Sequence, residues 1–394
     1  MRKVITFLGT RPKDSTYEWQ GKSYPGKVFA VALREFVEFD EMLVFITPEA
    51  KKETWPVMEK LNDPRIKPVE IKEGATSEDM WAIFQTVIAC VNTKETVIFD
   101  ITHGYRSLPF LTFLFTAYLK SAKQVNIEAI YYGALEMAAK NNGKAPVVNL
   151  SEFSAMLDWL AATEQFVQTG NADYLASQLD KSGLGPNSPL VQTVHSIAIG
   201  LELLRPSDVS VASRKLPEDL QSDEANLPKP FRVVSQRLQD AYCQFGLDES
   251  AANEIQNQLA NQLRMINWYH QTRHYVHTLA LAREWVVSLL CMELNLDIWD
   301  EHDREEAEYV MNPKGKNKPK NFDPNHQVLW KGHPHRKRIN LLWSGEPFYL
   351  AKFRNDVLHT GYRRNPKPPK EIITQTDGIV KEINEIATLW KSKI

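Results

Sequence analysis

The sequence predicts an α/β domain followed by an all-α region, and three observations lead to this expectation. In the first 150 residues, short continuous apolar runs alternate with segments of helical periodicity, as in a mostly parallel sheet covered by helices. From residue 151 onward, the apolar spacing is almost entirely helical. The length of 394 residues suits two to three domains of roughly 150 residues each. We therefore expect a Rossmann-like domain at 1–150, a helical connector at 151–249 and a helical domain at 250–394.

The N-terminal domain is expected to contain six strands, each a short run of β-branched, aliphatic or aromatic residues. They are Val4–Leu8, Met42–Thr47, Val69–Ile71, Thr96–Ile101, Ile127–Tyr132 and Val147–Leu150. Helical spacing of apolar residues predicts helices at Val28–Phe39, Ser77–Val91 and Ser107–Leu119. In the second of these, Glu78 and Asp79 lie in the first turn, where carboxylates suit the helix dipole. Strands separated by helices favour parallel pairing.

Residues 151–394 are predicted to be helical with two interruptions. The expected helices are Glu152–Gln168, Pro189–Leu204, Phe231–Phe245, a long segment that Ser250 caps and that ends near Leu294, Phe348–Leu358 and Ile372–Lys391. Residues 206–230 are rich in Pro, Ser, Asp and Glu, which indicates a linker or a long loop. Residues 311–338 are rich in Pro, Gly, Lys and His, which indicates a basic insertion in the C-terminal domain.

The composition is typical of a folded cytoplasmic protein. Hydrophobic residues make up 43% and charged residues 24%, which excludes a largely disordered chain. No uninterrupted apolar stretch of about 18 residues occurs and the N-terminus lacks signal-peptide features, so we expect neither a membrane span nor secretion. Cys90, Cys243 and Cys291 fit neither zinc spacing nor a disulfide framework, and we expect buried, reduced thiols.

The net charge of −2 conceals a strong asymmetry along the chain. Residues 312–370 contain 14 Lys and Arg but three Asp and Glu, a local charge of +11, and the remaining residues carry −13. Such a distribution indicates contact with a polyanion. A solvated basic loop is the alternative, and Lys314, Lys316, Lys318 and Lys320 could be no more than that.

Two polar segments follow predicted strands, at the positions where ligands bind in open parallel sheets. Gly9–Lys13 follows the first strand, and Asp100–Arg106 follows the fourth with the sequence DITHGYR. Gly104 can let a ligand approach the backbone closely, and Thr102 and Arg106 could hold a phosphate.

These segments exclude some ligands and leave one alternative open. Neither G-x-G-x-x-G nor G-x-x-x-x-G-K-[ST] occurs, so a dinucleotide site has no support and a P-loop is excluded. The alternative is structural: Asp100 and Thr102 would cap the following helix, and His103 would make a local hydrogen bond.

A second polar constellation, Arg354-Asn355-Asp356-Val357-Leu358-His359, lies within the basic stretch. A histidine can move protons near neutral pH, and an arginine can stabilise negative charge on a phosphate. Together they could cleave RNA without a metal, by activating its 2′-hydroxyl against the adjacent phosphate. Such a short pattern also occurs by chance, so a surface helix with an incidental Arg and His is the alternative.

The remaining histidines and aromatic residues favour structural roles. His326, His333 and His335 lie among cations without a nearby cysteine, so we expect solvated loop histidines and no metal site. Packing or polar support is expected for Arg273, His274, His277, Trp343 and Phe348. Trp330 could belong to the core or stack on a base.

The two motifs together resemble a known family. Asp100-Ile101-Thr102-His103-Gly104 matches the pattern that names the CRISPR-associated DxTHG-motif proteins, and the Arg354–His359 segment looks like the R-x4-6-H signature of HEPN ribonucleases. The family also has this order of domains: a Rossmann-like CARF domain, a helical connector and a C-terminal HEPN domain. The order of domains resembles the family over nearly the whole chain, whereas the residue-by-residue match is limited to the two motifs. The segment 311–338 has no counterpart in the family pattern.

The resemblance implies an accessory RNase of type III CRISPR–Cas systems. In such proteins a cyclic oligoadenylate binds across a CARF dimer and activates a HEPN dimer, which cuts single-stranded RNA without metal. Such cleavage leaves 2′,3′-cyclic phosphate ends. The implied activator is a cyclic oligoadenylate, with cyclic tetra-adenylate favoured, and the implied assembly is a homodimer or a higher even-numbered homo-oligomer.

The family's functional residues map onto both motifs of this sequence. The cyclic oligoadenylate would be lined by Gly9, Thr10, Asp100, Thr102, His103, Gly104 and Arg106. The nuclease site would be formed by Arg354, Asn355 and His359, with no metal or other cofactor.

Two alternatives to this function remain open. The chain could be a sensor whose C-terminal domain binds nucleic acid or a protein partner and cuts nothing, although the presence of Arg354 and His359 favours an enzyme. The α/β domain could also degrade its own cyclic oligoadenylate, an option that His103 keeps open.

Overall fold

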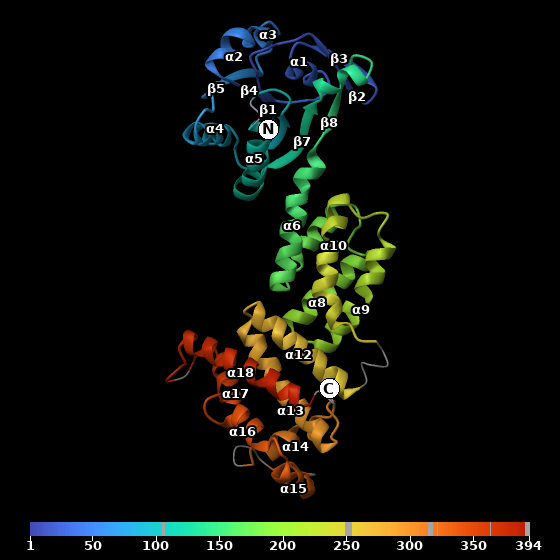
Figure 1. Ribbon diagram of the computed structural model, residues 1–394, viewed down its shortest axis with the longest axis vertical. Coiled ribbons are helices and arrows are strands. Elements are labelled where there is room, and N and C mark those ends of the chain that lie inside the picture. Colours follow the sequence, from blue (N-terminus) through green and yellow to red (C-terminus); the bar gives the residue numbers. More distant parts are fainter. Residues whose placement is uncertain (105–106, 249–253, 314–317, 321, 363, 391–394) are drawn as a thin grey trace. The chain divides into compact units, whose positions relative to one another are not determined.

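In the computed structural model, the chain divides into two compact units, Met1–Leu160 and Ala161–Ile394 (Figure 1). The structure describes residues 1–104, 107–248, 254–313, 318–320, 322–362 and 364–390. The first unit contains a mixed sheet with helices, and the second is built from helices, so the predicted fold class is confirmed. The division into three domains at residues 150 and 249 stays a prediction.

The first unit is organised around an eight-stranded sheet in the order β3-β2-β8-β7-β6-β1-β4-β5. Its strands are β1 (Arg2–Phe7), β2 (Ser15–Trp19), β3 (Lys22–Gly26), β4 (Glu41–Ile46), β5 (Ile66–Glu70), β6 (Thr96–Asp100), β7 (Asn126–Gly133) and β8 (Ala145–Asn149). Strands β5, β4, β1, β6 and β7 pair in parallel, as does β2 with β8. The pairs β2–β3 and β7–β8 are antiparallel. Each predicted strand is present within a few residues of its expected bounds.

The hairpin of β2 and β3 is the part of the sheet that the sequence analysis did not anticipate. Gln20 and Gly21 form its turn, and both have positive φ angles, of 50° and 76°. Two consecutive positive φ angles match the twist of an antiparallel hairpin. The hairpin extends the sheet beyond β8, and Tyr17 of β2 is fully buried against Phe29.

Helices cover both faces of the sheet and bury two separate cores (Figure 1). On one face lie α4 (Ser77–Ala89) and α5 (Leu108–Lys123), and on the other lie α1 (Phe29–Leu33), α2 (Pro48–Glu53) and α3 (Trp55–Glu59). In β1, Ile5 and Phe7 point to the first core and Val4 to the second, as the alternation of a strand requires. The expected helix at Val28–Phe39 is wrong in length, because helical structure ends at Leu33.

Beyond β8, the helices of the described residues run from α6 to α18, and α6 contains the boundary between the two units. They are α6 (Ser151–Thr169), α7 (Asp173–Lys181), α8 (Pro189–Glu202), α9 (Pro206–Ser222), α10 (Lys229–Tyr242), α12 (Ile255–Gln271), α13 (Tyr275–Leu294), α14 (Glu301–Met311), α15 (Pro324–Gly332), α16 (Arg336–Ser344), α17 (Leu350–Leu358) and α18 (Pro369–Leu389). Helix α13 is central, because it packs against α12 and against α14 to α18.

The expected linker at 206–230 is wrong, because α9 occupies most of it. Val209, Ala212, Leu216 and Leu220 are buried along one stripe of this helix. The spacing of three to four residues is helical, but Pro217 and the many Ser, Asp and Glu residues obscured it. Pro217 lies on the exposed side, within the helix.

The long segment expected to end near Leu294 is two helices rather than one. The chain turns between α12 and α13 at Arg273, whose φ is 63°. Ser250, the expected cap, lies outside the described residues. On either side of the turn, the His274 ring stacks on Trp268 at 5.9 Å and the His277 ring on Tyr269 at 5.2 Å, which confirms packing roles for both histidines.

The histidines of segment 311–338 are not solvated loop residues, and that expectation is wrong. The described part of the segment contributes α15 and the start of α16. His326 Nδ1 lies 2.6 Å from Glu306 Oε1, and His333 Nε2 lies 3.2 Å from Glu293 Oε2. The His333 ring stacks between Trp330 and Trp390, with centroids 5.2 and 6.0 Å away. Trp330 is therefore a core residue.

The cysteines are free thiols, as expected, but only Cys291 is fully buried. Cys90 and Cys243 are half-buried. Burial raises the pKa of each thiol, and raises that of Cys291 to about 12. Among the helices that the structure describes, none is long and apolar enough to cross a membrane.

Candidate functional site

Both polar segments of the first unit meet at the centre of its sheet. Strand β1 lies between β4 and β6, so the strand order reverses there, and ligands of open α/β sheets bind at such a point. Thr6 of β1 pairs in register with Asp100 of β6, which sets the two strand ends side by side. The following loops approach closely, since a Cβ atom built on Gly9 would lie 3.7 Å from the Gly104 nitrogen. The structure thus brings the predicted ligand segments together.

Asp100 anchors this arrangement from inside the protein. Its side chain is 0% exposed. One carboxylate oxygen accepts a hydrogen bond from the Thr6 hydroxyl at 2.6 Å, and the other accepts one from the Thr102 amide at 2.8 Å. Burial raises the pKa of Asp100, although His103 and the hydrogen bonds oppose this shift. Asp100 therefore holds the loop in shape and presents no carboxylate to solvent.

The side chains of Thr102 and His103 are also engaged by the protein itself. The Thr102 hydroxyl accepts a hydrogen bond from the Gly133 amide at 2.8 Å. The Phe29 amide donates to His103 Nε2 at 3.0 Å, which requires a neutral imidazole at that nitrogen. Burial lowers the pKa of His103 against the opposing charge of Asp100. Together these residues attach the loop after β6 to β7 and α1.

The open side of the site is formed by backbone. In the described part of the chain, no protein acceptor is found for the amides of Gly9, Thr10, His103 and Gly104. Gly104 is exposed with a φ of 112°, a conformation that favours glycine. Backbone amides without a protein acceptor at the end of a strand can bind anions such as phosphate. Arg106, the guanidinium expected here, lies outside the described residues.

The partners Thr6, Gly133 and Phe29 were missed by the sequence analysis. Each lies 31 to 94 residues from the motif residue it contacts, and none has a distinctive local pattern. The same holds for Thr54, whose hydroxyl donates to the Gly9 carbonyl at 2.7 Å and fixes the loop after β1.

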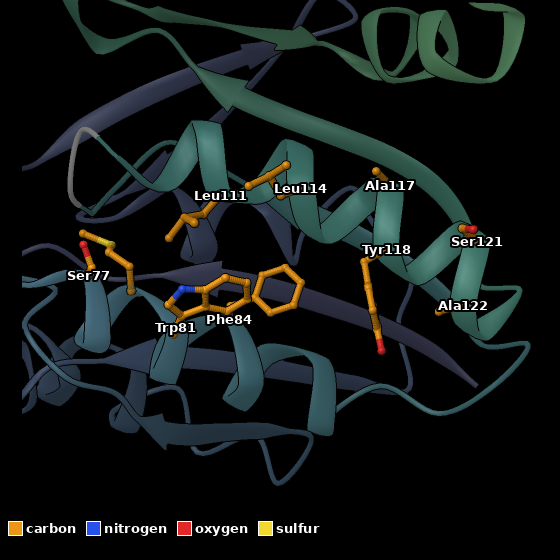
Figure 2. Close-up of a pocket in the computed structure, with 10 residues that line it drawn as sticks. Ser77, Trp81, Phe84, Leu111, Leu114, Ala117, Tyr118, Ser121 and Ala122 are labelled. Carbon is orange, nitrogen blue, oxygen red and sulfur yellow. The ribbon is translucent and has the colours of Figure 1, made fainter. Parts of the chain in front are cut away.

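An apolar hollow of the first unit lies between α4 and α5. Its volume is about 700 Å³, and Figure 2 shows the aromatic side chains that line it. Trp81 of α4 and Tyr118 of α5 are 65% and 44% exposed, and Phe84 lies between these helices. Its lining contains no charged side chain, so this hollow does not suit a phosphate.

The Arg-His motif lies at the C-terminal end of α17. Leu350, Phe353 and Asp356 are buried, and Arg354 and Asn355 are half-buried. The Arg354 Nη1 atom donates to the Asn355 side-chain oxygen at 3.1 Å.

His359 ends the helix and is exposed. Its amide donates to the Asn355 carbonyl at 3.0 Å, so helical hydrogen bonding extends to His359. His359 therefore lies little more than one helical turn after Arg354 along the chain. The buried Asp356 accepts from the Lys367 amide at 3.2 Å, which fastens the chain that follows the helix. The structure thus brings the three predicted nuclease residues to one end of one helix, with the imidazole open to solvent.

Electrostatics around α17 favour an anionic ligand. Burial, together with the positive charge of Arg283, lowers the pKa of Arg354, while Glu284 and Glu308 oppose this shift. Lys352 is exposed on the same helix, and Arg364 and Lys370 are exposed beyond it. Within the described ranges, no group of three or more His, Cys, Asp or Glu residues is arranged to hold a metal ion.

Comparisons with known proteins place the chain near CRISPR-associated proteins. The family model described as CRISPR-associated protein MJ1674, second domain, matches residues 155–249. CRISPR-associated protein MJ1674 of Methanocaldococcus jannaschii is 28% identical over an alignment of 183 residues, and the match covers 40% of this chain. The match spans 28% of the length of that curated relative.

Among solved structures, the chain is similar to Csm6 of Enterococcus italicus, determined with bound cyclic hexa-2′-fluoro-hexa-dAMP. The similarity covers 100% of this chain and 95% of that chain, with a TM-score of 0.47 and 10% sequence identity.

Proposed function

We propose that this protein is a CRISPR-associated endoribonuclease that a cyclic oligoadenylate activates. The observation that carries the proposal is the placement of Arg354, Asn355 and His359 at one end of α17, with an exposed imidazole and a half-buried guanidinium. The similarity of part of the chain to CRISPR-associated protein MJ1674 supports the biological setting.

In the proposed reaction, His359 removes the proton from a 2′-hydroxyl of single-stranded RNA. The resulting oxygen attacks the adjacent phosphorus and the bond to the 5′-oxygen breaks. The leaving oxygen takes up a proton from water, to which the protonated His359 returns its own, so the products are a 2′,3′-cyclic phosphate and a 5′-hydroxyl. Arg354 stabilises the negative charge that develops on the phosphate, and Asn355 orients the Arg354 side chain through its amide oxygen. No metal is required for these steps.

The activator would bind where the loops after β1 and β6 meet. The amides of Gly9, Thr10, His103 and Gly104 would hold phosphates of the cyclic oligoadenylate, and Thr102 and Arg106 would add side-chain contacts. Asp100 and His103 would act by positioning the loop, since both are engaged within the protein. His103 Nε2 accepts from the Phe29 amide, so a role for this histidine in degrading the ligand would fall to Nδ1, and that alternative stays open.

The test is to incubate the protein with labelled RNA in EDTA, with and without cyclic oligoadenylates of several ring sizes. We expect one of the cyclic oligoadenylates to increase the rate of cleavage, and we favour the ring of four adenylates. The products should carry 2′,3′-cyclic phosphate ends. His359→Ala should abolish cleavage and retain ligand binding in calorimetry, whereas exposed His302 on α14 provides the control substitution His302→Ala. Strict magnesium dependence, 5′-phosphate ends or full activity of His359→Ala would contradict the nuclease assignment.

Activation needs its own variant. Arg106→Ala should weaken activation, because the Arg106 guanidinium is proposed to bind a phosphate of the cyclic oligoadenylate. Cleavage without activator should stay unchanged, because Arg106 is not part of the proposed nuclease site. If no cyclic oligoadenylate binds the protein or raises its RNase rate, the sensor assignment is wrong.

A further inference from the structure

Tyr362, three residues after His359, is an aromatic side chain that the protein leaves almost completely open to solvent. It is 91% exposed, whereas the next most exposed of the large apolar side chains in the described part of the chain, Val233, is 69% exposed. Among the described residues, the Tyr362 side chain has no hydrogen bond, ion pair or ring contact. The ring therefore contributes nothing to the core of the helical unit, and its faces are available to a ligand.

A tight turn holds Tyr362 close to the histidine of the proposed nuclease site. The Tyr362 amide donates to the His359 carbonyl at 3.0 Å. The two residues between them, Thr360 and Gly361, have φ angles of 52° and 71°, and positive φ at both central positions is the pattern of a type I′ turn. The first and fourth Cα atoms of a β-turn lie less than about 7 Å apart. The aromatic ring and the imidazole thus extend from neighbouring points of the backbone.

The backbone on both sides of Tyr362 is fastened to one buried residue of α17, Asp356. The Gly361 amide donates to the Asp356 carbonyl at 3.3 Å, and the Lys367 amide donates to the Asp356 carboxylate at 3.2 Å. Lys367 also forms an ion pair with Glu371 of α18. Because Asp356 lies between Arg354 and His359 in the same helix, these bonds fix the backbone that carries Tyr362 relative to the Arg-His motif.

The charge around this turn favours a polyanion. Lys352 on α17 and Arg364 and Lys370 beyond it are exposed cations. Proteins that bind single-stranded nucleic acid combine such cations with aromatic rings on which bases stack. Stacking needs a ring with exposed faces, which Tyr362 provides. It also needs a base that has left its own stack, which a single strand offers and a duplex does not.

We propose that Tyr362 stacks on a base of single-stranded RNA next to the scissile phosphate and thereby positions that phosphate at Arg354 and His359. This inference rests on the proposed ribonuclease function and adds a contact with the substrate to it. It gives a role to an aromatic ring that packs against no other described side chain, and it links the nuclease site to the single-stranded form of its substrate.

The test compares two oligomers that the protein cannot cut. One is a 2′-O-methyl oligouridylate, which lacks the attacking hydroxyl and contains no adenylate that would occupy the proposed sensor. The other is an abasic oligomer of the same length. In fluorescence anisotropy, Tyr362→Leu should weaken binding of the oligouridylate about 5- to 150-fold, the range expected for the loss of one stacked base. Binding of the abasic oligomer should stay unchanged, because it has phosphates but no base to stack.

Two further variants serve as controls for the aromatic ring. Tyr362→Phe keeps the ring and should bind both oligomers as the original protein does. Trp299→Leu removes another exposed ring of the helical unit, between α13 and α14, and should leave both affinities unchanged. Sedimentation of Tyr362→Leu should match that of the original protein, because the ring is proposed to contact RNA and not a second copy of the chain.

Several results would overturn the stacking contact: unchanged binding of the oligouridylate by Tyr362→Leu, an equal loss for the abasic oligomer, an equal loss in Tyr362→Phe or Trp299→Leu, or a smaller assembly in sedimentation. These measurements need no cleavage, so the two proposals can fail separately. A protein that cuts no RNA, but loses affinity for the oligouridylate alone in Tyr362→Leu, would refute the proposed nuclease and retain the stacking contact. A protein that cuts RNA, but binds it equally well with Leu at this position, would do the reverse.

Discussion

Asp100 receives hydrogen bonds from the Thr6 hydroxyl and the Thr102 amide while it is completely enclosed. Leaving a buried acceptor without its hydrogen-bond donor costs about 1–3 kcal/mol of stability. Thr6→Val should therefore destabilise the first unit by that amount and loosen the loop after β6. Faster hydrogen exchange in peptides from β1 and β6 would reveal this loss.

Thr112 of α5 provides a matched comparison in the same unit. Its hydroxyl is also buried but has no hydrogen-bond partner among the residues described. Thr112→Val should leave stability unchanged or increase it slightly, because no bond is lost and an unsatisfied hydroxyl is removed. Equal effects of the two substitutions would show that the hydrogen bond from Thr6 to Asp100 contributes nothing beyond packing.

At the scale of elements, the loop between β6 and α5 depends on the backbone of Gly104. A Cβ atom there would lie 2.4 Å from Leu108 Cδ1 and 3.3 Å from Phe7 Cβ, at a φ of 112°. Gly104→Ala should therefore displace the loop and reduce cyclic oligoadenylate binding at least tenfold in calorimetry, and RNA cleavage without activator should persist. Gly143→Ala is the control, since Gly143 also has a positive φ, of 80°, but nothing lies within 4 Å. Similar losses in both variants would contradict the assignment of the ligand site to this loop.

Helix α9 contains a proline in its interior, at position 217. Proline has no amide hydrogen, so the Ser213 carbonyl lacks its regular helical partner. Pro217→Ala should restore this bond and stabilise the protein by about 1–2 kcal/mol in urea denaturation, after allowance for the greater freedom of the unfolded chain. Pro206→Ala should give no stabilisation, because Pro206 occupies the first turn, where proline suits the helix. A loss of stability in Pro217→Ala would mean that the proline shapes the packing of α9.

The elements that could be predicted from the sequence are those whose signal is local. Strand β6 is a continuous run of β-branched and aromatic residues, and a buried parallel strand needs no other pattern. The turn of the β2–β3 hairpin was missed because Gln20-Gly21 differs from the Asn-Gly and Asp-Gly pairs that usually mark such turns. Helix α9 was missed because composition was given more weight than the spacing of its buried residues.

For the candidate sites, position along the chain was predictable and the role of each side chain was not. The loops after β1 and β6 were expected to form one site and they adjoin. The roles of Asp100, Thr102 and His103 depend on tertiary contacts, which give no signal in the sequence near the motif. The partners in these contacts are Thr6, Gly133 and Phe29.

At the scale of the whole molecule, we expect two copies of the chain to share one nuclease cleft. One Arg354 and one His359 are few groups to hold, activate and stabilise a phosphate, and two-fold pairing doubles them. Arg354→Ala and His359→Ala proteins should each be inactive alone. Mixed after subunit exchange, about half of the dimers contain one copy of each, and such dimers retain one arginine and one histidine in the cleft. Partial recovery of RNA cleavage in the mixture is the expected result.

Mixing two samples of His359→Ala is the control for this experiment. Subunit exchange is checked by size difference, with one variant carrying a cleavable fusion. A mixture that exchanges subunits and stays as inactive as its parents would mean that each cleft uses the residues of a single chain.

The three native thiols of the protein also determine how its motions can be observed. Maleimide dyes react with the thiolate form, and burial makes that form scarce in Cys90, Cys243 and Cys291 near neutral pH. A cysteine introduced at an exposed position, such as 11 or 302, would therefore be labelled well before the native ones. One dye in each unit would then allow fluorescence energy transfer to follow, molecule by molecule, whether a ligand at the sheet changes the distance to the helices that carry His359.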